Sequence, residues 1–235
     1  MLPVLPSLEI GSATLTPHGA FFALGALAGG WYLVLQRKQL NLTVGDIFQR
    51  VFWIFALGLL GARLAFLLAY PDEWQSVLQI FQIWEGGLVS FGGIAVGVVV
   101  TVWFSGRAPR GGEWLAAAAK AFLIAWAVGR VGNFLSLDTS GLVSSSWNFL
   151  YGTIPIELFE ALGCLVLYLL VRHIEHPVIQ YVTLIGYFVV RFVVDFWRDE
   201  AVFGGLRVSQ WMSAAILVLL VTLYVSMRRY RKGVS

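Results

Sequence analysis

The chain is organised around residues 127–141, which read AVGRVGNFLSLDTSG. This stretch closes a long apolar run, yet it carries Arg130 where a membrane helix ordinarily carries no charge. On a helix, Arg130 and Asn133 share a face because they are three residues apart. Gly129 and Gly132 leave room for another segment to approach the same turn closely. A charge inside a membrane helix costs roughly 2.5–3.5 kcal/mol on insertion scales, so Arg130 indicates a functional site.

The composition indicates an integral membrane protein. Of the 235 residues, 59% are hydrophobic and 12% are charged, and the mean hydropathy is +0.80. A soluble domain has about a quarter of its residues charged, so this chain lacks the polar residues to cover a surface in water. Apolar runs of about 20 residues, the length that spans a bilayer, recur along its whole length. We therefore expect an all-α polytopic membrane protein, with one domain over residues 1–235 and no soluble module.

The hydropathy pattern predicts seven transmembrane helices, over residues 17–36, 46–70, 88–105, 114–135, 154–171, 178–197 and 211–227. Cytoplasmic loops are enriched in lysine and arginine, which therefore set the orientation. Most of those outside the spans lie in alternate loops and in the C-terminal tail: Arg37, Lys38, Arg107, Arg110, Arg172, Arg228, Arg229, Arg231 and Lys232. The opposite loops carry only Arg198 and Arg207. This bias predicts a cytoplasmic C-terminus and an N-terminus outside, and it accounts for the net charge of +3 without a nucleic-acid partner.

Five basic residues lie inside the predicted spans, and their depth separates them into two groups. Arg50 and Lys120 lie within about two turns of the cytoplasmic ends, so we expect their long side chains to extend to the interface. Arg63, Arg130 and Arg191 each lie in the outer half of a different span. If the three helix faces converge, they form a cationic pocket at the level of the outer headgroups.

The helix face that carries Arg191 adds further polar groups. Tyr187, Arg191, Asp195 and Arg198 follow one another at intervals of about one turn, so they line one face. Arginine is suited to bidentate recognition of phosphate, and we therefore expect the pocket to bind an anionic phospholipid. The alternative is an Arg–Asp pair that only holds helices together.

Taken together, these stretches resemble the prolipoprotein diacylglyceryl transferases. The family signature reads Gly-Arg-x-Gly-Asn-Phe-x-Asn-x-Glu-x-x-Gly. This chain matches it at Gly129, Arg130, Gly132, Asn133, Phe134 and Gly141, with Ser136 and Asp138 in place of the asparagine and the glutamate. Five other stretches of this chain resemble further motifs of the family and follow one another in the same order as in the family: Gly61–Arg63, Trp84–Leu88, Pro155–Glu160, Arg191–Arg198 and Leu206–Ser213. The resemblance covers most of the chain and implies a divergent, short member with the same seven spans.

The resemblance implies a reaction and a location. The family transfers the diacylglyceryl group of phosphatidylglycerol to the thiol of a lipobox cysteine in a secreted lipoprotein precursor, and glycerol phosphate leaves. Such an enzyme would lie in the bacterial cytoplasmic (inner) membrane, with its active site toward the outer leaflet.

The resemblance also implies roles for residues of this chain. Arg130 would bind the lipid phosphate, and Arg191, held by Asp195, would be a second contact to the phosphate or leaving group. The substrate-binding residues would be Arg63, Asn133, Asp138, Gly141, Tyr187 and Arg198.

Two departures from the family pattern bear on catalysis. The His or Tyr that usually precedes the Gly-Gly of the third span is Phe91 here, and a phenylalanine cannot accept a proton. The Tyr that usually precedes Gly at the start of the first span is His18. An imidazole titrates near neutrality, as a general base should, so His18 is the candidate base that would activate the thiol. The alternative is a helix-end histidine at the interface.

Other function classes therefore stay open. One alternative is a paralogue that uses an anionic phospholipid with a different acceptor. Another is a catalytically inactive lipid-binding membrane protein, which Phe91 favours. A small transporter or channel is disfavoured, because the charges cluster in the outer half of the spans. The scattered histidines and the single Cys164 predict no metal site and no cofactor.

Overall fold

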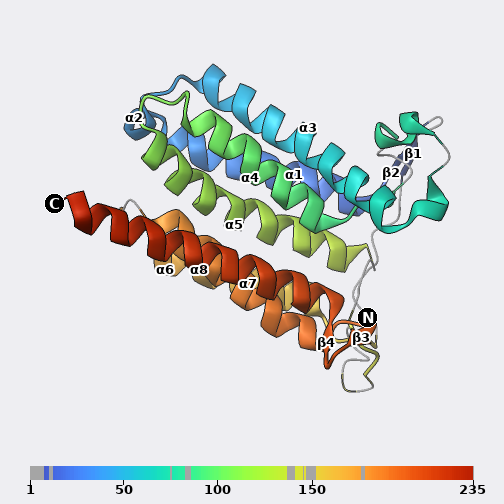
Figure 1. Cartoon of the computed structure of the whole chain (residues 1–235). Helices are drawn as coiled ribbons and strands as arrows, with labels where there is room; N and C mark the ends of the chain where they lie inside the picture. The colour runs from blue at the N-terminus through green and yellow to red at the C-terminus, as the bar shows by residue number, and fades with distance from the viewer. Residues whose placement is uncertain are drawn as a thin grey trace. The chain divides into compact units, whose positions relative to one another are not determined.

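The computed structural model describes residues 8–10, 13–74, 76–82, 86–136, 141–144, 146, 152–175 and 178–234. The α-helices are α1 Pro17–Leu35, α2 Arg37–Leu40, α3 Val44–Ala69, α4 Ser90–Ser105, α5 Gly111–Leu135, α6 Ile156–Val171, α7 Ile179–Val194 and α8 Val208–Val234 (Figure 1). Short 3-10 helices are η1 Pro71–Glu73, η2 Val77–Ile80 and η5 Asp195–Trp197. The structure also has two small two-stranded sheets. One pairs β1 Leu8–Ile10 with β2 Ala13–Leu15, and the other pairs β3 Val202–Phe203 with β4 Leu206–Arg207 in antiparallel fashion.

The described helices confirm a mostly helical membrane protein. Five are long and apolar enough to cross a bilayer: Pro17–Leu35, Val44–Ala69, Gly111–Leu135, Ile179–Trp197 and Val208–Ser226. The other two predicted spans coincide with α4 and α6, which have 16 residues each. At 1.5 Å per residue, such helices are shorter than a hydrocarbon core of about 30 Å. The chain is thus a multi-pass membrane protein, while seven spans and their orientation stay predictions.

The helices group into two compact units, each described by itself. The first consists mainly of Leu15–Gly29 and Ala119–Ser235, and the second mainly of Gly30–Ala118. In the first unit, α7 packs against both α6 and α8. Gly204 and Gly205 form the turn between β3 and β4, and their φ values of 58° and 84° suit glycine in a tight turn; α8 follows β4 directly. The expectation of a single domain stays a prediction.

In the second unit, α3 and α4 pack closely through glycines. A Cβ added to Gly92 would lie 2.5 Å from the carbonyl oxygen of Gly61, and one added to Gly93 would lie 3.2 Å from that of Gly58. Helices in lipid gain stability by this close approach of small residues. The glycines that open the third predicted span therefore serve helix packing.

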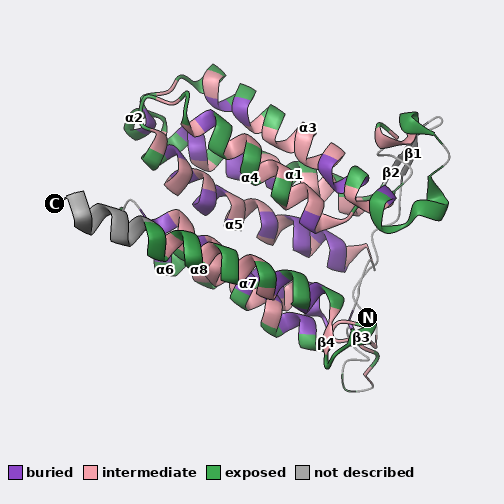
Figure 2. Ribbon diagram, in the orientation of Figure 1, coloured by how far each residue is buried: buried purple, intermediate pink, exposed green. Residues whose placement is uncertain are grey.

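Burial differs sharply between helices. Half of the most apolar window of α5 is buried, against 17% of that of α8. Figure 2 shows exposed residues along α8, where Val218 and Leu219 are 69% and 57% exposed. Exposed apolar side chains of this size belong against lipid rather than water.

Arg50 and Lys120 donate to main-chain carbonyls at helix ends, and the expectation that their side chains reach the membrane interface stays a prediction. Both are buried, at 7% and 6% exposure. Arg50 donates to the main-chain carbonyl of Phe104 at 3.1 Å, in the last turn of α4. Lys120 donates to the carbonyls of Arg172 and Ile174 at 3.2 and 2.9 Å, just after α6. The last carbonyls of a helix lack partners and carry a partial negative charge, so these cations cap neighbouring helix ends.

We expect Lys120→Met to lower the melting temperature of the detergent-purified protein by roughly 5 °C. Two part-buried helix-end carbonyl groups lose their donor, at a cost of about 1–3 kcal/mol. Lys38→Met, at an exposed position on α2, is the matched control and should shift it little. Equal melting temperatures for the two variants would refute the capping role.

Candidate functional site

Three arginines from different parts of the chain meet at one buried carboxylate, Glu160 of α6. Its Oε2 lies 3.1 Å from Nε of Arg130 and 4.0 Å from Nη2 of Arg198, and its Oε1 lies 3.2 Å from Nη1 of Arg191. Glu160 is 1% exposed. Ionised groups are stable at such burial only when they are paired and hydrogen-bonded. Glu160 therefore holds the guanidinium groups of α5, α7 and the segment after η5 together.

Neutral donors complete the environment of Glu160. Its Oε1 accepts hydrogen bonds from Nε1 of Trp126 at 2.7 Å and from the hydroxyl of Tyr187 at 3.1 Å. The Tyr187 hydroxyl in turn accepts from Nη1 of Arg191 at 3.2 Å. The guanidinium of Arg130 lies over the Trp126 ring, 5.0 Å from its centroid, a cation–π arrangement. Both oxygens of the carboxylate thus have fixed partners.

A second carboxylate, Asp195, joins Arg191 to Arg198. Nε of Arg198 donates to its Oδ1 at 2.7 Å, and Nε of Arg191 lies 3.8 Å from its Oδ2. Asp195 is fully buried, at 0% exposure. The helix face predicted to carry Tyr187, Arg191, Asp195 and Arg198 is therefore one connected network.

The ion-paired groups of this cluster do not balance in charge. Arg130, Arg191 and Arg198 face Glu160 and Asp195, so the formal charge of the five is +1. Glu157, one turn before Glu160 on α6, is a further buried acid with interactions of its own. Guanidinium groups that are fixed in a low-dielectric setting attract an anion strongly. The cluster is suited to an anionic group.

The α5 side of the cluster leads to His18 through Asn133. The neighbours of Asn133 assign the orientation of its carboxamide: with the oxygen facing Nη1 of Arg130 at 3.1 Å, the nitrogen donates to the carbonyl of Gly129 at 3.0 Å and to Nδ1 of His18 at 2.6 Å. The His18 ring stacks on Phe22, with centroids 4.9 Å apart. His18, Asn133 and Arg130 therefore form one hydrogen-bonded chain.

Glycines bring α1 and α5 close enough for this contact. A Cβ on Gly132 would lie 2.1 Å from Cβ of Phe21, and one on Gly25 would lie 2.4 Å from the carbonyl oxygen of Ala125. The close approach predicted for Gly132 is thus made by the first turns of α1. The two helices pack antiparallel, since His18 meets Asn133 whereas Gly25 meets Ala125.

Gly141 lies beside Arg198 in an irregular sheet-like contact. It forms an antiparallel bridge with Arg198, and the amide of Leu142 donates to the carbonyl of Trp197 at 2.8 Å. A Cβ on Gly141 would lie 1.9 Å from the carbonyl oxygen of Ile154, so only glycine fits. The structure thus brings Gly141 to the cluster through the main chain.

Two predicted site residues are not placed in this cluster by the described contacts. Arg63, in the second unit, donates to the main-chain carbonyls of Gln79, at 3.0 Å, and of Gly86. Arg63 thereby holds the segment between α3 and α4, and its grouping with Arg130 stays a prediction. Asp138 lies outside the described residues.

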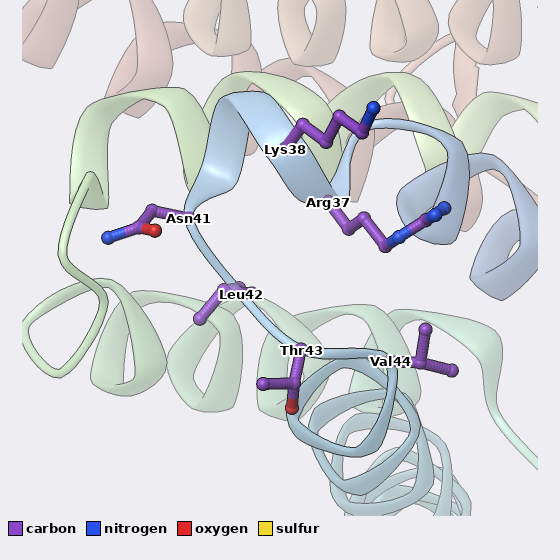
Figure 3. Close-up of a pocket in the computed structure, with 6 residues that line it drawn as sticks. All are labelled: Arg37, Lys38, Asn41, Leu42, Thr43 and Val44. Carbon is purple, nitrogen blue, oxygen red and sulfur yellow. The ribbon is translucent and has the colours of Figure 1, made fainter.

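A pocket of about 290 Å³ at the turn between α2 and α3 contains none of the predicted site residues. It is lined by Arg37, Lys38, Asn41, Leu42, Thr43 and Val44. Figure 3 shows the side chains of Arg37, Lys38 and Asn41 pointing in different directions around the turn. They converge on no common point, so this pocket is not a candidate for an anion site.

The sequence analysis did not assign Glu160 and Trp126 to the site. Two glutamates three residues apart at the start of an apolar span, Glu157 and Glu160, were a usable signal. Trp126 lies one turn before Arg130 on the same face, and a buried indole N–H normally finds an acceptor. Both residues contribute through a partner on another helix, which the spacing along one helix does not identify.

Comparisons with known proteins point to one family. The family model described as prolipoprotein diacylglyceryl transferase matches residues 4–226. A phosphatidylglycerol–prolipoprotein diacylglyceryl transferase of Lactococcus lactis subsp. cremoris is 30% identical over 251 residues, covering 97% of this chain and 95% of the relative. Proteins of the same name from Streptococcus suis and Streptococcus pneumoniae are 27% and 26% identical, covering 97% and 95% of this chain and 93% and 94% of their own lengths.

We expect Glu160→Gln to destabilise the protein by about 3–5 kcal/mol, because it leaves buried guanidinium groups without their shared anion. Thermal unfolding in detergent, followed by circular dichroism, measures the loss. Glu175→Gln, at an exposed position after α6, is the matched control. In the Glu160→Gln background, Arg191→Gln should restore part of the stability, since it removes one of the unpaired charges. A melting temperature equal to that of the control would contradict the central role of Glu160.

Proposed function

This chain belongs to the prolipoprotein diacylglyceryl transferase family, and we propose that it transfers the diacylglyceryl group of phosphatidylglycerol to a cysteine thiol of a secreted lipoprotein precursor. Glycerol phosphate is the second product. The observation that carries this proposal is the buried cluster of Arg130, Arg191 and Arg198, whose guanidinium groups meet at one glutamate. The match to the family over nearly the whole chain supports the same activity.

The transfer is a substitution at carbon. The sulfur of the thiolate, which is the nucleophilic form of cysteine, attacks the diacylglycerol carbon that carries the phosphate ester. A C–S bond forms, the C–O bond breaks, and its electron pair leaves with the phosphate oxygen. The phosphodiester carries one negative charge. The departing glycerol phosphate carries a second one, or takes up the proton that the thiol has lost.

Arginine groups stabilise this change because negative charge grows on the phosphate as the bond breaks. Donors fixed in a water-poor site are worth far more than in water, since they need no reorganisation during the reaction. Arg130 and Arg191 would contact the phosphate and the leaving group. Asp195 would hold Arg191 and Arg198, with which it is ion-paired. The lipid site would be shaped by the remaining predicted residues, which are Asn133, Tyr187, Arg198, Gly141, Asp138 and Arg63.

The proposal extends to the membrane. We propose seven spans in the bacterial cytoplasmic membrane, with the N-terminus outside, the C-terminus in the cytoplasm and the site toward the outer leaflet. The distribution of lysine and arginine supports this orientation. A site that opens outward would also meet a precursor after secretion.

A second candidate function is lipid binding without catalysis. Phe91, which replaces the usual His or Tyr, is buried at 8% exposure. Its side chain has no group that could transfer a proton. A protein of this kind would hold an anionic phospholipid in the same cluster without turnover. A third candidate is an enzyme that uses an anionic phospholipid with a different acceptor, and the turnover assay below distinguishes the three.

We expect Arg130→Lys to lower turnover by about 100-fold, because lysine keeps the charge facing Glu160 but lacks the planar fork that fits phosphate. The assay measures glycerol phosphate released from phosphatidylglycerol micelles in the presence of a lipobox peptide. Arg37→Lys, at an exposed position on α2, is the control and should keep wild-type turnover.

Two results would count against the transferase. Wild-type protein that binds phosphatidylglycerol but releases no glycerol phosphate with any thiol peptide would favour the inactive binder. Turnover of Arg130→Lys equal to that of Arg37→Lys would show that the cluster does not contact the phosphate.

Labelling of single cysteines tests the orientation. Cys164 is the only cysteine and is buried, so Cys164→Ser gives a background without reactive thiols. In this background, Val143→Cys, at a position 83% exposed, should react with a membrane-impermeant maleimide on intact spheroplasts. Gly112→Cys, where an added Cβ meets nothing within 4 Å, should react only after permeabilisation. The reverse pattern would invert the proposed topology.

A further inference from the structure

The orientation of the Asn133 carboxamide fixes the proton of His18. Two of its neighbours have only one possible hydrogen-bonding role. The guanidinium of Arg130 can only donate, and the carbonyl of Gly129 can only accept. The amide oxygen must therefore face Arg130, at 3.1 Å, and the amide nitrogen must face Gly129, at 3.0 Å.

The same nitrogen of Asn133 lies 2.6 Å from Nδ1 of His18. Its second hydrogen points to the imidazole, so Nδ1 is the acceptor of this hydrogen bond. A neutral imidazole accepts at one ring nitrogen and carries its proton on the other. His18 is therefore the tautomer with the proton on Nε2.

This tautomer does not suit a general base. The one in-plane lone pair of the neutral ring lies on Nδ1, where Asn133 already donates to it. To take a proton from a thiol, His18 would have to give up that hydrogen bond or turn its ring. The ring is stacked on Phe22, with an interplanar angle of 29°, and Asn133 is 5% exposed and held by Arg130. Both contacts oppose such a change.

We propose that His18 serves as an N–H donor through Nε2 to a phosphate oxygen of the lipid, and that Asn133 is the positioning residue that sets this tautomer. The choice of phosphate rests on the proposed function, because His18 is linked through Asn133 to Arg130, the group assigned to the phosphate. The tautomer itself rests on the hydrogen bonds alone. This role differs from the general base that the sequence analysis predicted for His18.

The tautomer can be measured without any turnover. Protein labelled with ¹⁵N-histidine, in detergent micelles, gives one set of ring couplings for each of its three histidines, and His18→Gln identifies the set of His18. We expect the pattern of the Nε2–H form. In Asn133→Asp the carboxylate can only accept, so His18 should switch to the Nδ1–H form. An Nδ1–H pattern in the wild type would overturn the proposal.

Turnover then tests the role. The amide nitrogen of glutamine can occupy the place of Nε2–H, so His18→Gln should keep turnover within about tenfold of wild type, whereas His18→Ala should lose roughly 100-fold or more. A base would be lost equally in both variants. His173→Gln, at an exposed position after α6, is the matched control.

The two readouts separate two kinds of failure. If the wild type releases no glycerol phosphate but shows the Nε2–H pattern, the proposed function fails and the tautomer stands. If the wild type turns over and His18→Gln falls as far as His18→Ala, the donor role fails while the transferase stands.

Discussion

The shared carboxylate of Glu160 is the interaction on which the rest of the site depends. Arginines that lie close together repel one another in a low dielectric, by several kcal/mol at 4 Å even at an effective dielectric constant of 20. One anion placed between them, with oxygens 3.1 and 3.2 Å from Arg130 and Arg191, offsets that repulsion. Glu160 serves three arginines, and Asp195 pairs with two of them, so these ion pairs hold three guanidinium groups close together with two acids.

The other basic residues within the predicted spans have a different kind of partner. Arg50, Lys120 and Arg63 donate to main-chain carbonyls, two of them at helix ends and one in the connection between α3 and α4. Such contacts satisfy the cation and the backbone at once. The two kinds of partner have different effects. Carbonyl partners anchor a segment, whereas a shared carboxylate brings several arginines together in one buried cluster. Depth in the membrane alone does not distinguish the two uses.

The sequence predicted the polar face of α7 and the turn of α5, since Arg191, Asp195 and Arg130 stand out in apolar runs and helical spacing places them. The sequence could not identify Glu160 as a site residue, because the ion pairs of this acid are with arginines from other helices and segments. It could not identify the partners of Lys120 for the same reason: the carbonyls that Lys120 caps follow α6. The geometry around His18 was beyond reach as well, since the direction of one amide decides which ring nitrogen carries the proton. Helix identity and face follow from local periodicity, whereas charge pairing and proton placement follow from tertiary contact.

The glycine contacts between α1 and α5 have a mechanical consequence. At Gly25 and Gly132 there is space for a hydrogen atom and nothing larger, so sliding α1 along α5 by a single residue would drive a side chain into the opposite backbone. The close contacts therefore fix the position of α1 along the axis of α5. That position decides which turn of α1 faces Asn133, so the imidazole is held at its height in the membrane by residues that have no side chain at all.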